Sequence, residues 1–348
     1  MSIFLSIIKK ESLHLVRDPR TVLIVLCMPI ILLLLFGFAI STEVNNVDVG
    51  IVTDSHSQEV RDIVSRIGSS PYFTLRGMMS QPEIEPALRD GVVDAVLVLR
   101  ESSGKVDHQV VADASNPNNA QIYASYLEGV MSRNVPDPAL TTTLYNPQLK
   151  SSYNFVPGIM GMIFILICAM MTSVSIVREK ESGTMNLLLV SPIKPRTIIL
   201  GKLIPYFVLS LMILALMLAF SYTLLGIPFS VTALNTVWVS VLYIIMSLAI
   251  GLLISTVAKT QFTALVISGV LCIFPVTMLS GMLFPVENMP VALQWFSCTV
   301  PARWYIDAMR TLMIQQLDIM YVIDDIAILA SITVLVITAA ILQFSRNK

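Results

Sequence analysis

Six long apolar stretches dominate the pattern of hydrophobic and polar positions along this chain of 348 residues. None of the six contains Asp, Glu, Lys, Arg or His. A helix needs about 20 apolar residues to cross the hydrocarbon layer, and its backbone polar groups must be paired internally. Each stretch is therefore predicted to be a membrane-spanning helix. The stretches are residues 21–40, 154–177, 203–224, 234–257, 262–284 and 326–345.

Residues 41–152 follow a different pattern, in which short strand-like and helix-like segments alternate. Such alternation predicts a small α/β domain. The predicted strands are 47–53, 72–76, 92–99 and 108–112, and the predicted helices are 57–67, 83–90 and 120–131. The sequence thus predicts an α-helical polytopic membrane protein with six transmembrane helices and an inserted extracytoplasmic α/β domain.

Charge follows the same division of the chain. Only 13% of all residues are charged, whereas soluble proteins average about 25%. Residues 41–152 hold 8 of the 22 Lys and Arg and 14 of the 23 Asp and Glu. The formal net charge of −1 excludes a nucleic-acid binder that depends on excess positive charge.

Lys and Arg in the short connections predict the orientation, because such residues accumulate on the cytoplasmic side. Only Arg303 and Arg310 fall on one side of the six stretches. The other side holds Lys9, Lys10, Arg17, Arg20, Arg178, Lys180, Lys194, Arg196, Lys202, Lys259, Arg346 and Lys348. Both termini are therefore predicted to be cytoplasmic, with residues 41–152 outside.

The start of the chain is predicted to form an amphipathic helix in the cytoplasmic interface. Ile3, Phe4 and Ile7 contribute to a broad apolar face, whereas Lys9 and Arg17 lie elsewhere. A simple basic flank that fixes the topology is the alternative interpretation. The first apolar stretch, 21–40, is read as an uncleaved anchor because it is longer than the core of a typical signal peptide.

The connection after the second stretch combines a charge cluster with a short apolar segment. Residues 178–181 are Arg, Glu, Lys and Glu; Gly183 and Thr184 follow, and residues 187–190 are apolar before Pro192. Apolar residues on a water-facing helix need a partner. Two interpretations remain open: a docking helix for a cytoplasmic protein, or a topogenic charge cluster followed by an interfacial helix.

Residues 280–310 are apolar and aromatic but are interrupted by Pro285, Pro290 and Pro301. This pattern predicts a hairpin that dips into the outer leaflet and packs against protein, where irregular backbone is tolerated. Arg303 and Asp307 are spaced i, i+4 and could pair on one helix face. An interfacial aromatic belt and a substrate gate are equally favoured functions for this segment.

No residue pattern in the sequence predicts catalysis or metal binding by this chain. The four cysteines form no C-x-x-C pair, only Cys298 lies outside the apolar stretches, and His56 and His108 lack ligand spacing. The chain has no phosphate-binding G-x-x-x-x-G-K-[ST] motif and no ionisable residue inside the stretches of the kind that ion-coupled carriers use. The sequence therefore shows neither an ATP site nor an ion-coupling site of its own.

Over essentially its whole length, the chain resembles the permease subunits of ATP-binding-cassette exporters of the type-2 permease family. It is most similar to bacterial multidrug-type permeases with a large first outer loop. The residues that carry the resemblance are Arg17, Asp18, Pro19 and Arg20, the segment 113–118, Glu179, Gly183, Thr184 and Pro192, the segment 280–285, Met289, Pro290 and Pro301.

The resemblance implies a half-transporter in the inner membrane of a bacterium. Two such chains, identical or paired with a sister permease, would join two cytoplasmic ABC ATPase subunits, which would bind ATP and Mg²⁺; this chain would hold no cofactor. The implied parts are a connecting helix at 1–20, a coupling loop at 178–197 and an outer re-entrant hairpin at 285–310.

The resemblance also implies roles for individual residues. Those implied for ATPase coupling are Arg178, Glu179, Glu181, Gly183, Thr184, Leu188 and Pro192. Those of the connecting helix are Lys9, Arg17, Asp18 and Arg20. Those of the outer re-entrant gate are Gly281, Phe284, Pro285, Pro290, Pro301 and Arg303.

Two functions are compatible with the sequence. The first is a permease subunit that moves a hydrophobic or amphipathic substrate, drug-like or lipid-like, out of the cytoplasm or the inner leaflet. The second is a membrane sensor or scaffold, in which the outer domain binds a ligand and the loop at 178–192 contacts a cytoplasmic partner. A partner ATPase discriminates between them.

Overall fold

A computed structural model describes residues 3–39, 47–55, 57–70, 72–102, 105–112, 117–131, 151–184, 195–229 and 232–346. The chain divides into two compact units, one formed by residues 1–40 together with 150–348 and the other by residues 41–149. The first unit is helical and the second contains the sheet.

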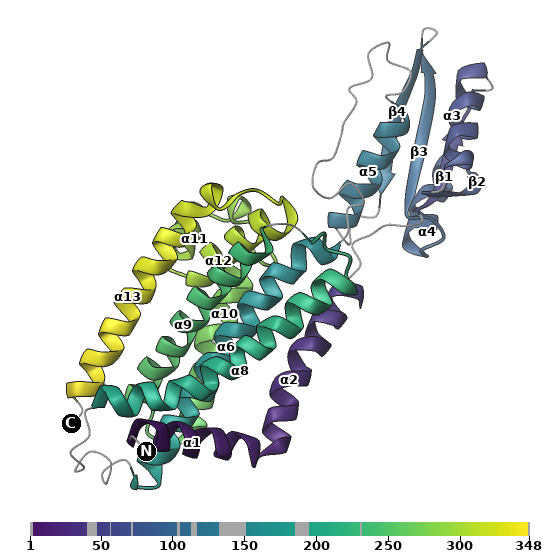
Figure 1. Cartoon of the computed structure of the whole chain (residues 1–348). Helices are drawn as coiled ribbons and strands as arrows, with labels where there is room; N and C mark the ends of the chain where they lie inside the picture. The colour runs from purple at the N-terminus through teal and green to yellow at the C-terminus, as the bar shows by residue number, and fades with distance from the viewer. Residues whose placement is uncertain are drawn as a thin grey trace. The chain divides into compact units, whose positions relative to one another are not determined.

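Six helices of the described chain are long and apolar enough to cross a membrane, which confirms the predicted fold class. In Figure 1 they run alongside one another, and a further helix, α1 (Ile3–Val16), lies across one end. The six are α2 (Pro19–Leu34, continued by a π-helical turn at Leu35–Ala39), α6 (Ser151–Glu181), α8 (Pro195–Thr223), α9 (Ala233–Val257), α10 (Gln261–Leu279) and α13 (Ile323–Arg346).

The helix ends differ from the apolar stretches in ways that local chemistry explains. The first spanning helix begins at Pro19, because Asp18 caps its N-terminus; Arg20 therefore belongs to α2 and not to the preceding segment. The fifth ends at Leu279, five residues before the apolar stretch does, and Gly281 follows with a φ of 80°. The second continues to Glu181, so residues 178–181 are helical rather than part of a loop.

The segment after α10 consists of short helices joined by turns. These are a 3₁₀ turn at Val286–Asn288, α11 (Val291–Ser297), α12 (Pro301–Met309), a π-helical turn at Arg310–Ile314 and a 3₁₀ turn at Ile319–Val322. Pro290 is the N-cap of α11, and Pro301 occupies the first turn of α12, where its missing N–H costs no hydrogen bond. The prolines thus divide this segment into short helices: α11 begins directly after Pro290, and α12 begins at Pro301.

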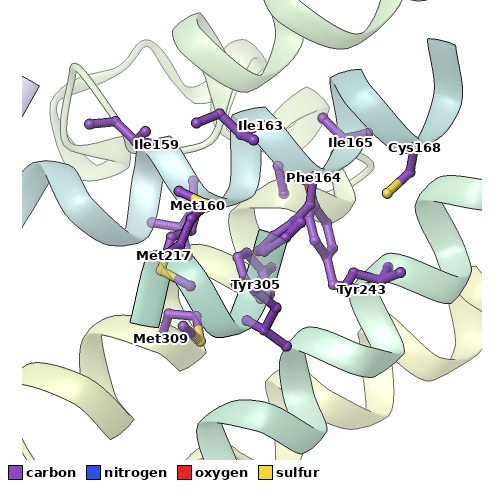
Figure 2. Close-up of a cluster of buried hydrophobic side chains, with 14 of the residues drawn as sticks. Ile159, Met160, Ile163, Phe164, Ile165, Cys168, Met217, Tyr243, Tyr305 and Met309 are labelled. Atoms are coloured by element: carbon purple, nitrogen blue, oxygen red, sulfur yellow. The ribbon is translucent and has the colours of Figure 1, made fainter. Parts of the chain in front are cut away.

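The core of the helical unit lies between α6, α8, α9 and α12. Figure 2 shows Tyr243 and Tyr305 among isoleucine, methionine and phenylalanine side chains. The two tyrosine rings stack with centroids 4.2 Å apart, and the Tyr243 hydroxyl donates to the Gly161 carbonyl at 3.0 Å. The Tyr305 hydroxyl lies 3.0 Å from Ser240 Oγ. Both buried phenols therefore have the partners that an apolar environment requires.

Helices α6 and α9 pack closely because Gly251 has no side chain. A Cβ at this position would lie 2.6 Å from the carbonyl oxygen of Ala169 and 2.7 Å from the Cβ of Thr172. Small residues let membrane helices approach each other backbone to backbone. Gly251 thus permits the close approach of α6 and α9.

The second unit is an α/β domain with a four-stranded sheet in the order β2-β1-β3-β4. Strand β1 is parallel to β2 and β3, and β4 is antiparallel to β3. Its elements are β1 (Val47–Thr53), α3 (Gln58–Ser69), β2 (Phe73–Met78), a 3₁₀ turn at Gln81–Glu83, α4 (Ile84–Arg89), β3 (Ala95–Ser102), β4 (Lys105–Ala112) and α5 (Pro117–Met131). All seven predicted segments occur, and β4 and α5 begin three residues earlier than predicted.

Strand β3 is apolar at successive positions because both faces of the sheet are covered. Ala95, Leu97 and Leu99 belong to a core with residues of α3 and α5, whereas Val96 and Val98 belong to a second core with residues of α4. A strand buried on both faces needs no polar alternation. The continuous apolar run in the sequence of β3 therefore arises because the strand contributes to a hydrophobic core on each face of the sheet.

Several residues considered as candidate chemical sites occupy ordinary positions. Cys168 and Cys272 are buried, whereas Cys298 and also Cys27 are exposed. Cys27 is exposed although it lies in an apolar stretch, because α2 has little protein packed around it. His108 is exposed on β4. His56 and residues 113–116 lie outside the described residues.

Candidate functional site

A cluster of four charged side chains connects α1, α6 and α8 at one end of the bundle. The Lys202 ammonium lies between two carboxylates, 2.9 Å from Glu11 Oε1 and 3.1 Å from Glu179 Oε1. Lys10 contacts the same Glu179 oxygen at 2.7 Å. The side chains of Lys202, Glu11 and Glu179 are only 4%, 7% and 10% exposed. We call Lys10, Glu11, Glu179 and Lys202 the buried ion cluster.

Burying a charge is costly unless the charge is paired, so the ions in this cluster depend on one another. Each carboxylate comes from a different helix, and Lys202 of α8 joins them. Glu11 also accepts a hydrogen bond from Ser175 of α6 at 3.4 Å. The cluster therefore holds three helices in one relative arrangement, in a way that apolar packing alone would not specify.

The sequence around the cluster brings α1 close to α8. Gly201 precedes Lys202, and a Cβ at this glycine would lie 2.9 Å from Ile7 Cγ2. The apolar face of α1 thus packs on the backbone of α8, which places Glu11 within reach of Lys202. The apolar face that led to the prediction of an amphipathic helix at the start of the chain therefore packs against α8.

The environment of the buried ion cluster favours the charged form of the Lys10 side chain. Partial burial lowers the pKa of Lys10, but the hydrogen bond and negative charge of Glu179 outweigh this effect and raise the pKa above its usual value. The second oxygen of Glu179, Oε2, is buried and has no hydrogen-bond partner among the described residues. One oxygen of Glu179 thus carries both lysine contacts.

Of the remaining coupling candidates, Arg178 and Glu181 lie at the C-terminal end of α6 and contact the start of α10. Arg178 Nε donates to Gln261 Oε1 at 3.1 Å, and Gln261 Nε2 donates to Glu181 Oε2 at 2.7 Å. Gly183 ends the helix with a φ of 75°, and the Thr184 hydroxyl donates to the Glu179 carbonyl at 3.3 Å. Leu188 and Pro192 lie outside the described residues.

The connecting-helix candidates divide between a surface and a helix cap. Lys9 and Arg17 are exposed and line an open hollow of about 770 Å³ on α1, together with Lys10, His14 and other α1 residues. Asp18 caps α2 by accepting from the Thr21 N–H at 3.2 Å and from its hydroxyl at 2.6 Å. These hydrogen bonds lower the pKa of Asp18.

The outer-gate candidates surround the turn after α10. Arg310 donates to the Gly281 carbonyl at 2.7 Å, which ties the turn to the end of α12. Arg303 donates to Ser297 Oγ at 2.6 Å, and the predicted contact with Asp307 occurs at 3.9 Å. Burial raises the pKa of Asp307 despite both neighbouring arginines. Phe284 and Pro285 are exposed, and Pro290 and Pro301 cap or start the short helices.

Sequence reasoning singled out Glu179 but missed its partners. Glu11 had no assigned role, and Lys10 and Lys202 were counted only as residues that fix the orientation. The signal lay in the helix boundaries: the third apolar stretch was started at residue 203, directly after Lys202, although α8 begins at Pro195. A lysine inside a helix was the signal available from the sequence, whereas its glutamate partners follow only from the packing.

Known proteins resemble the chain along nearly all of its length. The profile of the family described as ABC-2 family transporter protein matches residues 19–342. "Probable multidrug ABC transporter permease YbhR" of Escherichia coli K12 is 30% identical, over 98% of each chain. "Probable multidrug ABC transporter permease YbhS" of the same organism is 28% identical, over 92% of this chain and 91% of its own.

A further relative, "Inner membrane transport permease YhhJ" of the same strain, is 26% identical over 69% of this chain and 68% of its own. The match to the family covers five of the six spanning helices entirely, nearly all of α13, and the buried Glu179 and Lys202. The six apolar helices and the bacterial relatives together indicate a multi-pass protein of the inner membrane. The chain belongs to the ABC-2 transporter family and is the permease subunit of an ABC transporter, with the ATPase activity in a separate subunit.

Proposed function

We propose that this permease exports a hydrophobic or amphipathic substrate and that the buried ion cluster couples its helices to ATP hydrolysis. Family membership favours transport over the sensor alternative, and it implies partnership with ABC ATPase subunits. Two relatives are named as probable multidrug permeases, which supports a drug-like or lipid-like substrate. The cluster is the observation that carries the coupling proposal.

Coupling requires a rigid connection between the ATPase surface and the spanning helices. Glu179 lies four residues before Gly183 and the segment that resembles a coupling helix, and it is joined through Lys202 to α8. A displacement of that segment would move α6, α8 and α1 together, because separating them would leave buried charges unpaired. The cluster is thus suited to transmit motion.

The exposed hollow on α1 supports a second contact with the ATPase. Lys9, Lys10 and Arg17 outnumber the one acidic lining residue, Asp18, so it would attract an acidic protein surface. We propose that two ATPase subunits bind to two permease chains here and at residues 178–197. ATP and Mg²⁺ would be bound by these subunits, and no cofactor by this chain.

The exposed apolar faces of α2 and α10 support a second permease chain. Phe262, Val270 and Phe274 of α10 are each more than 60% exposed within this chain. A sister permease or a second copy could pack on these faces, and lipid would cover the remainder. The re-entrant role of residues 285–310 as an outer gate belongs to the same proposal.

The orientation follows from the distribution of Lys and Arg. Helix α1 and the C-terminal end of α13 lie at the same end of the bundle in Figure 1, which supports a common side for both termini. We propose that this side is cytoplasmic. Residues 41–152 would then be extracytoplasmic.

The test is substrate-stimulated ATP hydrolysis by the permease reconstituted with its ATPase. Glu179→Ala removes the shared carboxylate, and Gly183→Pro is incompatible with the φ of 75°. Both variants are expected to insert into the membrane and to lose the stimulation. Gly68→Ala in the outer domain, where a Cβ would meet nothing within 4 Å, is the control. Wild-type stimulation in both variants would refute the coupling role.

A further inference from the structure

An apolar groove of about 410 Å³ lies between α8, α9 and α13. All of its lining residues are apolar. Ile199, Leu248, Ala249 and Leu252 form its buried floor, and Leu200 at its rim is 55% exposed. Helices α8 and α13 both pack against α9. The small side chain of Ala249 leaves space in the floor that a larger residue would fill.

The position of the groove along the helices matches one leaflet of a bilayer. Its lining residues reach close to one end of each helix: Ile199 lies near the start of α8, Leu252 near the end of α9 and Ile341 near the end of α13. At a rise of 1.5 Å per residue, each of these residues is within about 8 Å of the helix end. From Ile199 to Phe207 the groove extends about 12 Å, close to half of the roughly 30 Å hydrocarbon thickness. A lipid acyl chain that lies along the membrane normal would occupy the same depth and length of the membrane as this groove.

The charged residues that these three helix ends contribute are all basic, and Glu181 at the end of the neighbouring α6 contacts Gln261 after α9. Arg196 is the second residue of α8, Lys259 follows α9, and Arg346 is the last residue of α13. The sequence has no Asp or Glu between Glu181 and Glu287, and none after Asp325. Basic residues at the membrane surface attract anionic lipid headgroups. The end of the groove is therefore suited to a negatively charged phosphate.

We propose that this groove is a binding site for one acyl chain of an anionic phospholipid, whose headgroup lies at the basic ends of α8, α9 and α13. The site does not depend on the proposed transport cycle, and only its assignment to the cytoplasmic leaflet uses the proposed orientation. The lipid would fill the gap between α8 and α13 and hold these helices at a fixed spacing on α9.

The first test measures lipid retention. The full chain is purified in mild detergent with phosphatidylglycerol or phosphatidylcholine of the same acyl chains, and bound lipid is counted by native mass spectrometry. Phosphatidylglycerol is expected to remain bound to the wild type, and Ala249→Phe is expected to retain roughly tenfold less. Leu335→Phe, on a face of α13 that does not line the groove, is the matched control and should retain as much as the wild type.

The second test needs no change to the groove floor. The three native tryptophans, Trp238, Trp295 and Trp304, do not line the groove, so Leu200→Trp adds a distinct fluorescent signal at its rim. Brominated phosphatidylglycerol at low mole fraction is expected to quench this signal more strongly than brominated phosphatidylcholine, and added salt should reduce the difference. Equal quenching by the two lipids, or equal lipid retention by the wild type and Ala249→Phe, would overturn the proposal.

Discussion

At the scale of single residues, the central feature is one carboxylate oxygen that contacts two lysines. Glu179 Oε1 lies 2.7 Å from Lys10 and 3.1 Å from Lys202. The two lysines differ in environment, because the Lys10 side chain is 60% exposed and that of Lys202 is 4% exposed. Water can replace one contact but not the other. The consequence of removing each lysine should therefore differ.

Replacement of Lys202 by methionine is expected to destabilise the helical unit by about 3 kcal/mol, because it leaves Glu11 and Glu179 buried without their shared partner. Lys10→Met is expected to cost less than about 1 kcal/mol, as for an exposed ion pair. Thermal unfolding in detergent measures both. Equal losses of stability would show that burial does not determine the strength of the cluster.

The sequence predicted functional importance for only some of the residues around the buried ion cluster. Glu179 stood out because a charge cluster beside Gly183 resembles a known motif, and Asp18 stood out beside Pro19. Lys202 and Glu11 could not be paired from the sequence, since they lie 191 positions apart and their contact depends on how α1 packs over Gly201. Pairing across helices is a tertiary property.

At the scale of elements, apolar composition predicted every spanning helix because lipid imposes the same demand on each. The ends were less well predicted. Helices α6 and α8 both extend past their apolar stretches into charged residues, because Glu179 and Lys202 are buried against protein rather than exposed to lipid. The outer strands were predicted for a comparable reason, since burial on two faces gave β3 a continuous apolar run.

The close contact between α6 and α9 predicts that Gly251 cannot be replaced without a loss of stability. Gly251→Ala would bring a Cβ to 2.6 Å from a backbone oxygen that no rotamer change can move, so a loss of about 1–3 kcal/mol is expected. Gly269→Ala in α10 meets nothing within 4 Å and should be neutral or stabilise by up to about 1 kcal/mol. Unfolding midpoints of the two variants in detergent provide the comparison, and equal midpoints would contradict the close packing.

At the scale of the whole molecule, two units with separate cores share one chain. Residues 47–131 contain all four strands and the helices that cover both faces of the sheet. This domain is expected to fold alone in water, with the circular dichroism of a mixed α/β protein and cooperative thermal unfolding. A non-cooperative transition would mean that its stability depends on the helical unit.

The substrate is the property that the sequence and fold predict least. The spanning helices are apolar because they face lipid and each other, and the same composition would serve many exported compounds. The buried charged residues are more informative, because buried charges have few structural alternatives. Glu179 is therefore the residue whose proposed role matters most.

The most direct measurement is the amount of substrate transported per ATP hydrolysed in inverted membrane vesicles that contain the permease and its ATPase. Glu179→Gln removes the charge in the buried ion cluster, and Glu85→Gln makes the same change at an exposed position of α4 in the α/β domain. Glu179→Gln is predicted to lose most of the transport per ATP, whereas Glu85→Gln should keep it. Wild-type transport per ATP in Glu179→Gln would contradict the proposed coupling.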